Sequence, residues 1–238
     1  MAGGVCPEPS AALIFHSCWG QGSAQLLLLP EDLPLPEPDD LSLSLLVTGG
    51  YTGRVPRNEG RPAPVGLMIR KGEVVGRNIA RMDGILVLGP EPGALRLERR
   101  SSVDLDGRRY DLSPLEQRSA FIAAASAAGL SVVQSHLLVI DGKADTRAVE
   151  DAPRSRRRIL FTDAAGFGVW QSRGPLTLDA AARRLVSERA PLMALNLDMG
   201  SYDFCLRRRA GQAAERCGAL TPQQIDGKLS SVILLNLR

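Results

Sequence analysis

The chain has 238 residues, of which 44% are hydrophobic, so it can bury a substantial core and is not a disordered polymer. Its 29 lysines and arginines against 26 acidic residues give a formal net charge of +3, a balance that by itself requires neither a nucleic-acid nor a membrane partner. Its apolar runs are far shorter than the ~20 residues that cross a bilayer, so no transmembrane segment is expected.

The first half of the chain carries the signals of β-structure. Proline and acidic residues crowd residues 29–40, so this stretch should be an exposed connection rather than a helix or a central strand. Apolar runs bounded by turn residues follow at residues 41–47, 64–75, 84–88, 94–97 and 103–110. Two of these runs contain turns, at Lys71-Gly72 and Asp106-Gly107, and are predicted hairpins. We expect residues 1–40 to form an N-terminal strand and a proline-rich connection, and residues 41–238 to form the main domain.

Two helices are predicted in the second half. The first begins at Ser113, whose side chain can cap it, with Pro114 in the first turn and Glu116 at the capping-box position, and it ends at Gly129. The second covers residues 178–190. Strands are expected at residues 131–140, 158–162, 167–171, 192–197, 202–207 and 232–237. With no internal repeat, this pattern predicts an α+β fold, a single domain with a mixed, largely antiparallel sheet and a few packed helices.

Four cysteines bear on the compartment in which the protein works. Cys6 and Cys18 are separated by 12 positions, and so are Cys205 and Cys217, a spacing that suits two local disulfides in an oxidising compartment. Other pairings and reduced buried thiols are the alternatives. The first ten residues lack the basic start and long apolar stretch of a secretory signal. We therefore expect a mature periplasmic or secreted protein, with a cytoplasmic location as the alternative.

Three separated segments carry the functional signals of the sequence. The first is Val47-Thr48-Gly49-Gly50-Tyr51-Thr52, followed by a predicted hairpin. The second combines the strand that contains Gln134 with Arg157-Arg158-Ile159-Leu160-Phe161. The third is a helix opening at Leu176-Thr177-Leu178-Asp179 and then Ala194-Leu195-Asn196-Leu197-Asp198-Met199-Gly200-Ser201. In their order and spacing, over residues 40–205, these segments resemble the phosphodiester glycosidase family.

The resemblance implies a hydrolase that cleaves a sugar-phosphodiester linkage in a glycan or envelope polymer. The leaving group in that reaction is a phosphate monoester, which departs far more readily than a sugar hydroxyl, so a general acid is less necessary. What remains is to hold the anion and to stabilise positive charge at the anomeric carbon, tasks suited to an arginine and a carboxylate. The catalytic candidates are therefore Arg157, for the phosphate, and Asp198, as nucleophile, base or charge stabiliser.

Residues near these two are candidates for binding the phosphorylated sugar or glycan. Strand alternation puts Asn196 and Asp198 on one face, with Leu195 and Leu197 toward the core. Backbone N–H groups in the two glycine-containing turns could cradle an oxyanion. The substrate-binding candidates are Thr48, Gly49, Gly50, Tyr51, Gln134, Asn196, Gly200 and Ser201.

Two alternative functions are also open, one from departures from the family pattern and one from runs of arginine. Thr48 stands in place of an asparagine, Phe161 and Met199 in place of glycines, and Tyr202 in place of a serine, so the second hypothesis is an inactive family member that binds phosphate-bearing glycans. The arginine runs at residues 154–158 and 207–209 suggest a third, a protein that binds an anionic polymer or nucleic acid. Aromatic residues are only 4% of the chain, which leaves few stacking platforms and disfavours nucleic acid.

No cofactor is expected. The cysteines lack C-x-x-C spacing, and the glycine and lysine patterns of nucleotide-binding loops are missing. His136 is isolated on a predicted strand without a nucleophile motif, so we expect it to be structural. A divalent cation is possible but not indicated, because Asp141, Asp163 and Asp203, which could join Asp198, have no calcium-loop spacing. The sequence indicates no particular oligomeric state.

Overall fold

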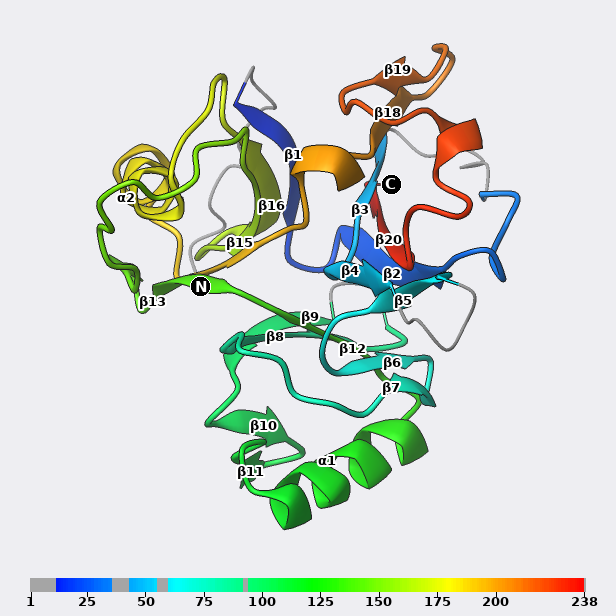
Figure 1. The fold of residues 1–238 in the computed structure, drawn as a ribbon, viewed down its shortest axis with the longest axis vertical. Coiled ribbons are helices and arrows are strands. Elements are labelled where there is room, and N and C mark those ends of the chain that lie inside the picture. The colour runs from blue at the N-terminus through cyan, green and yellow to red at the C-terminus, as the bar shows by residue number, and fades with distance from the viewer. Residues whose placement is uncertain (1–11, 36–42, 55–59, 92–93, 238) are drawn as a thin grey trace.

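The structure, a computed structural model, describes residues 12–35, 43–54, 60–91 and 94–237 (Figure 1). Across these ranges the chain forms two α-helices and many antiparallel strands in several sheets, which confirms the predicted α+β class. None of the helices in these ranges has the length and apolar character needed to span a bilayer.

Three large antiparallel sheets make up most of the molecule. The six-stranded sheet has the order β1 (Leu13–Cys18), β16 (Gly166–Gln171), β15 (Arg158–Thr162), β17 (Met193–Asn196), β13 (Leu137–Ile140) and β14 (Lys143–Ala144). The β3 sheet has the order β19 (Glu215–Arg216), β18 (Cys205–Arg209), β3 (Leu43–Thr48), β20 (Ser231–Leu237) and β2 (Gly22–Leu28). The β12 sheet has the order β7 (Glu73–Gly76), β6 (Met68–Arg70), β12 (Ser131–Ser135), β8 (Gly84–Leu88) and β9 (Leu95–Arg99).

Smaller elements complete the fold. Two strand pairs stand apart from the large sheets, β4 (Thr52–Arg54) with β5 (Pro62–Pro64) and β10 (Val103–Leu105) with β11 (Arg108–Tyr110). The helices are α1 (Leu115–Ala127) and α2 (Leu178–Arg189), and short 3-10 turns lie at Gly200–Tyr202 and Pro222–Gln224.

One hydrophobic core joins the three large sheets. Phe15 of β1, Val47 of β3, Leu86 of β8 and Ile233 of β20 belong to the same cluster of buried side chains. Helix α1 packs on the other face of the β12 sheet, and α2 packs on the outer face of the six-stranded sheet (Figure 1). Because burial of apolar surface dominates folding energetics, this shared core fixes the sheets relative to one another.

The strand predicted at residues 131–140 is two strands in two different sheets. β12 ends at Ser135 in the β12 sheet, and β13 begins at Leu137 in the six-stranded sheet. His136 is the residue between them, and its carbonyl oxygen accepts a hydrogen bond of 2.9 Å from the backbone N–H of Asn196. The single-strand prediction was wrong because the chain crosses between sheets inside one apolar run. His136 therefore lies where the two sheets meet.

The start of helix α1 differs from the prediction. Pro114 occupies the N-cap position, and no side chain caps the helix there. The backbone N–H of Ser113 donates to the Asp111 carboxylate at 2.9 Å, and the Gln117 side chain accepts from the Asp111 N–H at 2.9 Å. The Ser113 cap was therefore a wrong prediction, because Asp111 closes the preceding turn. Gly129, with φ of +65°, follows the end of the helix as expected.

A disulfide joins Cys205 and Cys217, with their Cα atoms 4.9 Å apart, as the spacing predicted. It links β18 to the segment that follows β19. Cys18 ends β1, whereas Cys6 lies outside the described residues, so the pairing of these two cysteines stays a prediction. Within the first forty residues, β1 pairs with β16 and β2 pairs with β20.

Candidate active site

Asp198 lies just after the end of β17 and faces the segment that follows β3. Its carboxylate accepts hydrogen bonds from the backbone N–H of Thr52, at 3.2 Å, and from that of Met199, at 2.9 Å. The residue is only 5% exposed. Burial raises the pKa of this carboxyl group to about 6, although both hydrogen bonds act in the opposite direction. Asp198 therefore changes charge close to neutral pH.

Asn196, the last residue of β17, bonds the same segment after β3 that Asp198 does. Its side-chain Nδ2 donates to the Tyr51 hydroxyl oxygen and, at 3.0 Å, to the backbone oxygen of Leu197. Leu195 and Leu197 point into the common core. The Oδ1 atom of Asn196 is buried and has no hydrogen-bond partner among the described residues. An unmet acceptor in a residue that is 1% exposed carries an energetic cost that a donor on a ligand would remove.

Tyr51 connects the two glycines after β3 to this cluster. Burial raises the pKa of its hydroxyl to about 12, and the charges of Asp198 and Arg157 act on it in opposite directions. The Tyr51 ring meets the His136 ring edge to face, with centroids 5.4 Å apart. Burial also lowers the pKa of His136. At neutral pH the site therefore holds a protonated phenol beside a neutral imidazole.

Arg157 brings a positive charge to the same group of residues. Its Nε donates to the backbone oxygen of Leu176 at 2.9 Å, and its Nη2 donates to that of Pro153 at 2.7 Å. Burial lowers the pKa of Arg157 while Tyr51 raises it, so the guanidinium lies within electrostatic range of the Tyr51 hydroxyl. A guanidinium has five N–H donors, and in the described part of the chain only these two bonds from it are formed. Donors remain for an anion.

The glycine turn after β3 does not offer its N–H groups to a ligand. The Gly49 N–H donates to the Ser231 carbonyl at 3.1 Å, and the Gly50 N–H donates to the Ser231 hydroxyl at 3.2 Å. A Cβ atom on Gly49 would come within 2.6 Å of the Ser231 hydroxyl oxygen, and one on Gly50 within 2.9 Å of Val133. Both glycines are thus explained by close packing, and the predicted oxyanion cradle is not available at this turn.

Two further candidates have their polar atoms engaged inside the protein. Thr48 is fully buried, and its hydroxyl donates to the backbone oxygen of Tyr202 and accepts from the Phe204 N–H at 3.0 Å. The Gln134 side chain is also fully buried and bonds backbone groups of Leu67, just before β6, and of Ala80 and Met82, between β7 and β8. Thr48 therefore anchors the loop that follows Asp198, while Gln134 organises a connection.

Gly200 and Ser201 form the 3-10 turn immediately after Asp198 and Met199. Gly200 has φ of +76°, and both residues are exposed. A left-handed conformation at this point favours glycine, because a side chain would cost strain energy. The turn therefore stays open to solvent beside the buried Asp198 carboxylate.

Arg158 is a key residue that lies, in the sequence, in an arginine run from which binding of an anionic polymer was the third hypothesis. It is fully buried, and its Nη1 forms an ion pair with Asp203 at 2.9 Å. Nη1 also donates to the backbone oxygen of Phe204 at 3.1 Å, while Nε and Nη2 both donate to the Gln171 side chain. Burial lowers the pKa of Arg158 and the Asp203 charge raises it. We call Arg158, Gln171, Asp203 and Phe204 the Arg158 clamp; it holds the end of the Asp198 loop.

Two of the acidic residues considered as companions of Asp198 have other partners. Asp163 pairs with His16 at 3.0 Å, and Asp203 belongs to the Arg158 clamp. Among the described residues, no group of three or more histidine, cysteine or acidic side chains is arranged to hold a metal ion.

The fold and the Asp198 site define a mostly antiparallel α+β protein with a buried acidic residue at the end of a central strand. No protein-family model matches the chain, and no curated protein does. Among solved structures, it is similar to the catalytic domain of zebrafish N-acetylglucosamine-1-phosphodiester alpha-N-acetylglucosaminidase, with a TM-score of 0.50, 13% identity, and coverage of 92% of this chain and 73% of that one. A hypothetical protein from Synechocystis has a TM-score of 0.51 and 13% identity, with 92% and 57% covered. These likenesses establish a distant relation in fold.

Proposed function

We propose that this protein is a hydrolase that cleaves the bond between a sugar and a phosphodiester. The single observation that carries the proposal is the cluster of Asp198, Asn196, Tyr51 and Arg157, in which a buried carboxyl with a pKa of about 6 and a guanidinium act on the same phenol. The fold shared with an enzyme whose name describes this chemistry supports the reaction class.

The reaction breaks the bond between the anomeric carbon and the phosphate oxygen. Arg157 binds the phosphate through its remaining donors, so the electron pair of the broken bond leaves on a neutralised anion. Asp198, ionised above a pKa of about 6, stabilises the positive charge that develops on the sugar or attacks its anomeric carbon. Water then supplies a hydroxyl to the sugar and a proton to the medium.

Tyr51 and Asn196 orient the sugar in this proposal. The Tyr51 hydroxyl keeps its proton, since its pKa is raised to about 12, and can donate to a substrate oxygen while it accepts from Asn196. The buried Oδ1 of Asn196 accepts from a sugar hydroxyl. We assign Gly200 and Ser201, in the exposed turn beside Asp198, to contact with the substrate as it reaches the carboxylate.

The test uses purified protein and a panel of glycosyl phosphodiesters that differ in the sugar, with free sugar as the measured product. Asp198→Asn should lower kcat/KM by about 10³-fold or more, because it removes the ionisable group. Asp151→Asn is the matched control, since Asp151 is exposed and has φ of +59°, a conformation that asparagine tolerates. An active Asp198→Asn variant, or a wild-type protein inert on the whole panel, would contradict the proposal.

A second candidate function is binding of phosphate-bearing glycans without turnover. The observation that favours it is that Ser231 occupies the N–H groups of Gly49 and Gly50, which removes one of the two predicted anion cradles. Saturable glycan binding with no released sugar would support this alternative. The third hypothesis, an anionic polymer, loses part of its basis because Arg158 is buried and Arg207 pairs with Glu215.

We also propose a periplasmic or secreted location for the protein. The Cys205–Cys217 disulfide supports it, because such bonds persist in oxidising compartments. Fractionation of the source cells with an antibody to the chain, analysed without reducing agent, tests the location and the bond together.

A further inference from the structure

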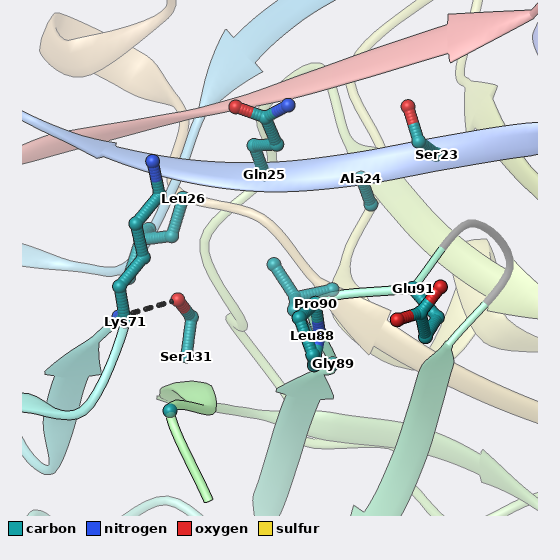
Figure 2. A pocket seen from close by; sticks show the side chains of 11 residues that line it. Ser23, Ala24, Gln25, Leu26, Lys71, Leu88, Gly89, Pro90, Glu91 and Ser131 are labelled. Atoms are coloured by element: carbon teal, nitrogen blue, oxygen red, sulfur yellow. Dashed lines mark hydrogen bonds between the residues drawn. The ribbon is translucent and has the colours of Figure 1, made fainter. Parts of the chain in front are cut away.

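A cavity of about 430 Å³ lies away from the Asp198 site, between strand β2 and the ends of the β12 sheet (Figure 2). Ser23, Ala24, Gln25 and Leu26 line one side, while Lys71 and Glu91 are among the residues on the other. Consecutive strand residues point to opposite faces, so a cavity on one face would contact only alternate residues. Contact with four in a row means that this cavity runs along the edge of β2.

β2 is an edge strand of the β3 sheet, and its register shows which backbone groups face outward. Leu28 pairs with Ser231, and the next N–H, of Leu29, donates to the Ser230 carbonyl at 3.1 Å. In an antiparallel ladder, residues whose N–H and C=O groups point to the partner strand alternate with residues whose groups point away. The groups of Ala24 and Leu26 therefore point away from β20, toward the cavity.

The outward groups of Leu28 show the same pattern and are already occupied. Its N–H donates to the Asp32 carboxylate at 2.8 Å, and its carbonyl accepts from the Asp32 N–H at 2.9 Å. Asp32 in turn pairs with Arg70 of β6. The edge is therefore closed beyond Leu26, and the open part is confined to the cavity.

The outward backbone groups of Leu26 have no hydrogen-bond partner among the described residues, which favours a ligand in the cavity. The residue is only 1% exposed, and no hydrogen bond from its outward N–H or to its outward C=O is formed within the described residues. Buried backbone groups are paired in the great majority of cases, because an unpaired one costs free energy. A ligand with its own amide could satisfy these groups.

Opposite charges flank the open edge. Lys71 lies toward the Leu26 end of β2 and Glu91 toward the Ala24 end in the view of Figure 2. The Lys71 N–H donates to the Ser131 hydroxyl at 2.9 Å, which holds the lysine backbone at the cavity wall. Neither the Lys71 ammonium nor the Glu91 carboxylate forms an ion pair with another described residue.

We propose that this cavity binds a short free peptide of two or three residues, laid along β2 as an added parallel strand. Its ammonium end faces Glu91 and its carboxylate end faces Lys71. Its amide N–H donates to the outward C=O of Ala24, and a carboxylate oxygen accepts from the outward N–H of Leu26. Two strand steps separate Ala24 from Leu26, about 7 Å, and an extended dipeptide spans about the same length. This site is independent of the hydrolase proposal.

The test is a calorimetric titration of the intact protein with Ala-Ala, N-acetyl-Ala-Ala and Ala-Ala amide. Ala-Ala should bind most tightly, and each blocked form should bind about two- to fivefold more weakly, the usual worth of an exposed charge pair. Glu91→Gln should weaken binding of Ala-Ala but not of the acetylated form, and Lys71→Gln should weaken binding of Ala-Ala but not of the amide. Glu150→Gln and Lys143→Gln, both exposed and outside the cavity, are the matched controls.

A backbone variant tests the strand geometry separately from the charges. Ala24→Pro removes an outward N–H without removing a bond to β20, and proline is tolerated at such edge positions. It should weaken Ala-Ala binding about tenfold or more, because the proline ring occupies the edge along which the first residue of the peptide lies. If Ala24→Pro fails to fold, the charge variants still decide the matter.

Three outcomes would overturn the proposal. They are no binding of any peptide, binding that ignores Lys71 and Glu91, and self-association of the protein that Ala24→Pro abolishes, which would assign the edge to a second copy. Asp198→Asn should bind Ala-Ala as the wild type does, so failure of the peptide site and failure of the hydrolase proposal are distinguishable.

Discussion

Arg157 and Arg158 are neighbours in the sequence but belong to two regions with opposite properties. Arg157 is partly exposed, donates two hydrogen bonds to loop carbonyls and interacts electrostatically with Tyr51. Arg158 is fully buried, and its three nitrogens contact Gln171, Asp203 and Phe204. Residue type is the same in both, so unused hydrogen-bonding capacity, rather than charge, separates the arginine that we propose binds the phosphate from the structural one. We therefore expect replacement of Arg157 to lower activity and replacement of Arg158 to lower stability.

The largest effect is expected at the Arg158 clamp. Arg158→Met should lower the free energy of unfolding by about 3–5 kcal/mol, because it leaves the Asp203 carboxylate buried without its partner. Chemical denaturation followed by circular dichroism measures the loss. The double variant Arg158→Met/Asp203→Asn should recover part of it, since no uncompensated charge remains. A single variant as stable as wild type would show that the clamp does not hold the loop.

Arg157→Met should act on catalysis rather than on folding. We expect kcat/KM on a glycosyl phosphodiester to fall by about 10²–10³-fold, as for loss of a group that stabilises transition-state charge. The melting temperature should change less than for Arg158→Met, because the Arg157 side chain donates only to two backbone carbonyls, one exposed and one half-buried, and holds no buried charge partner in the described part of the chain. Arg156→Met, at an exposed neighbouring position, is the control. Equal losses of stability in the Arg157 and Arg158 variants would remove the distinction between the two regions.

The sequence predicts those features of the two regions that depend on contacts between neighbours in the chain. The turns at Lys71-Gly72 and Asp106-Gly107 follow from short-range chemistry, and all four residues have positive φ in the structure. The position of Leu195 and Leu197 in the common core likewise agrees with the predicted alternation. These features were predictable because neighbours in the chain determine them.

The features that were missed depend on residues far away in the sequence. Ser231 accepts hydrogen bonds from the N–H groups of Gly49 and Gly50, although it is more than 180 positions away in the sequence. No residue near the glycines in the chain indicates this contact. Arg158 looks like part of a basic run, but it is the first residue of a strand whose pairing with β16 buries it beside Gln171. A buried arginine is rare without a partner, and its partner Asp203 comes from a distant loop.

The disulfide lies next to the clamp and should have a smaller effect on stability. Cys205 directly follows Phe204, whose carbonyl Arg158 binds, so the bond constrains the same end of the Asp198 loop. Replacing Cys205 and Cys217 together by serine should cost about 2–3 kcal/mol, the entropy that a short closed loop withholds from the unfolded chain. Denaturation with and without reductant measures it. Reductant should lower wild-type stability by more than it lowers that of the double variant, in which only the predicted Cys6–Cys18 bond is left to reduce.

The smallest effect on stability is expected from the titration of Asp198. It distinguishes the Asp198 site, where a buried carboxyl has no ion-pair partner among the described residues, from the Arg158 clamp, where the buried charges are paired. Its pKa is about 6 in the folded protein against 3.8 for the unperturbed group, so the folded state favours the neutral carboxyl. That preference contributes stability fully below pH 4, and the contribution is lost as the pH rises through 6. Relative to wild type, Asp198→Asn should therefore gain about 2 kcal/mol of stability between pH 4 and pH 8.

Denaturation midpoints of the two proteins across this range measure the difference. Activity should move the opposite way in the same window, because the reaction needs the ionised form that the folded protein disfavours: kcat/KM should rise with a midpoint near pH 6. A difference that stays flat from pH 4 to pH 8 would mean that Asp198 is solvated like a surface carboxylate. The energetic cost of burying the Asp198 charge, on which the predicted pH dependence rests, would then be absent.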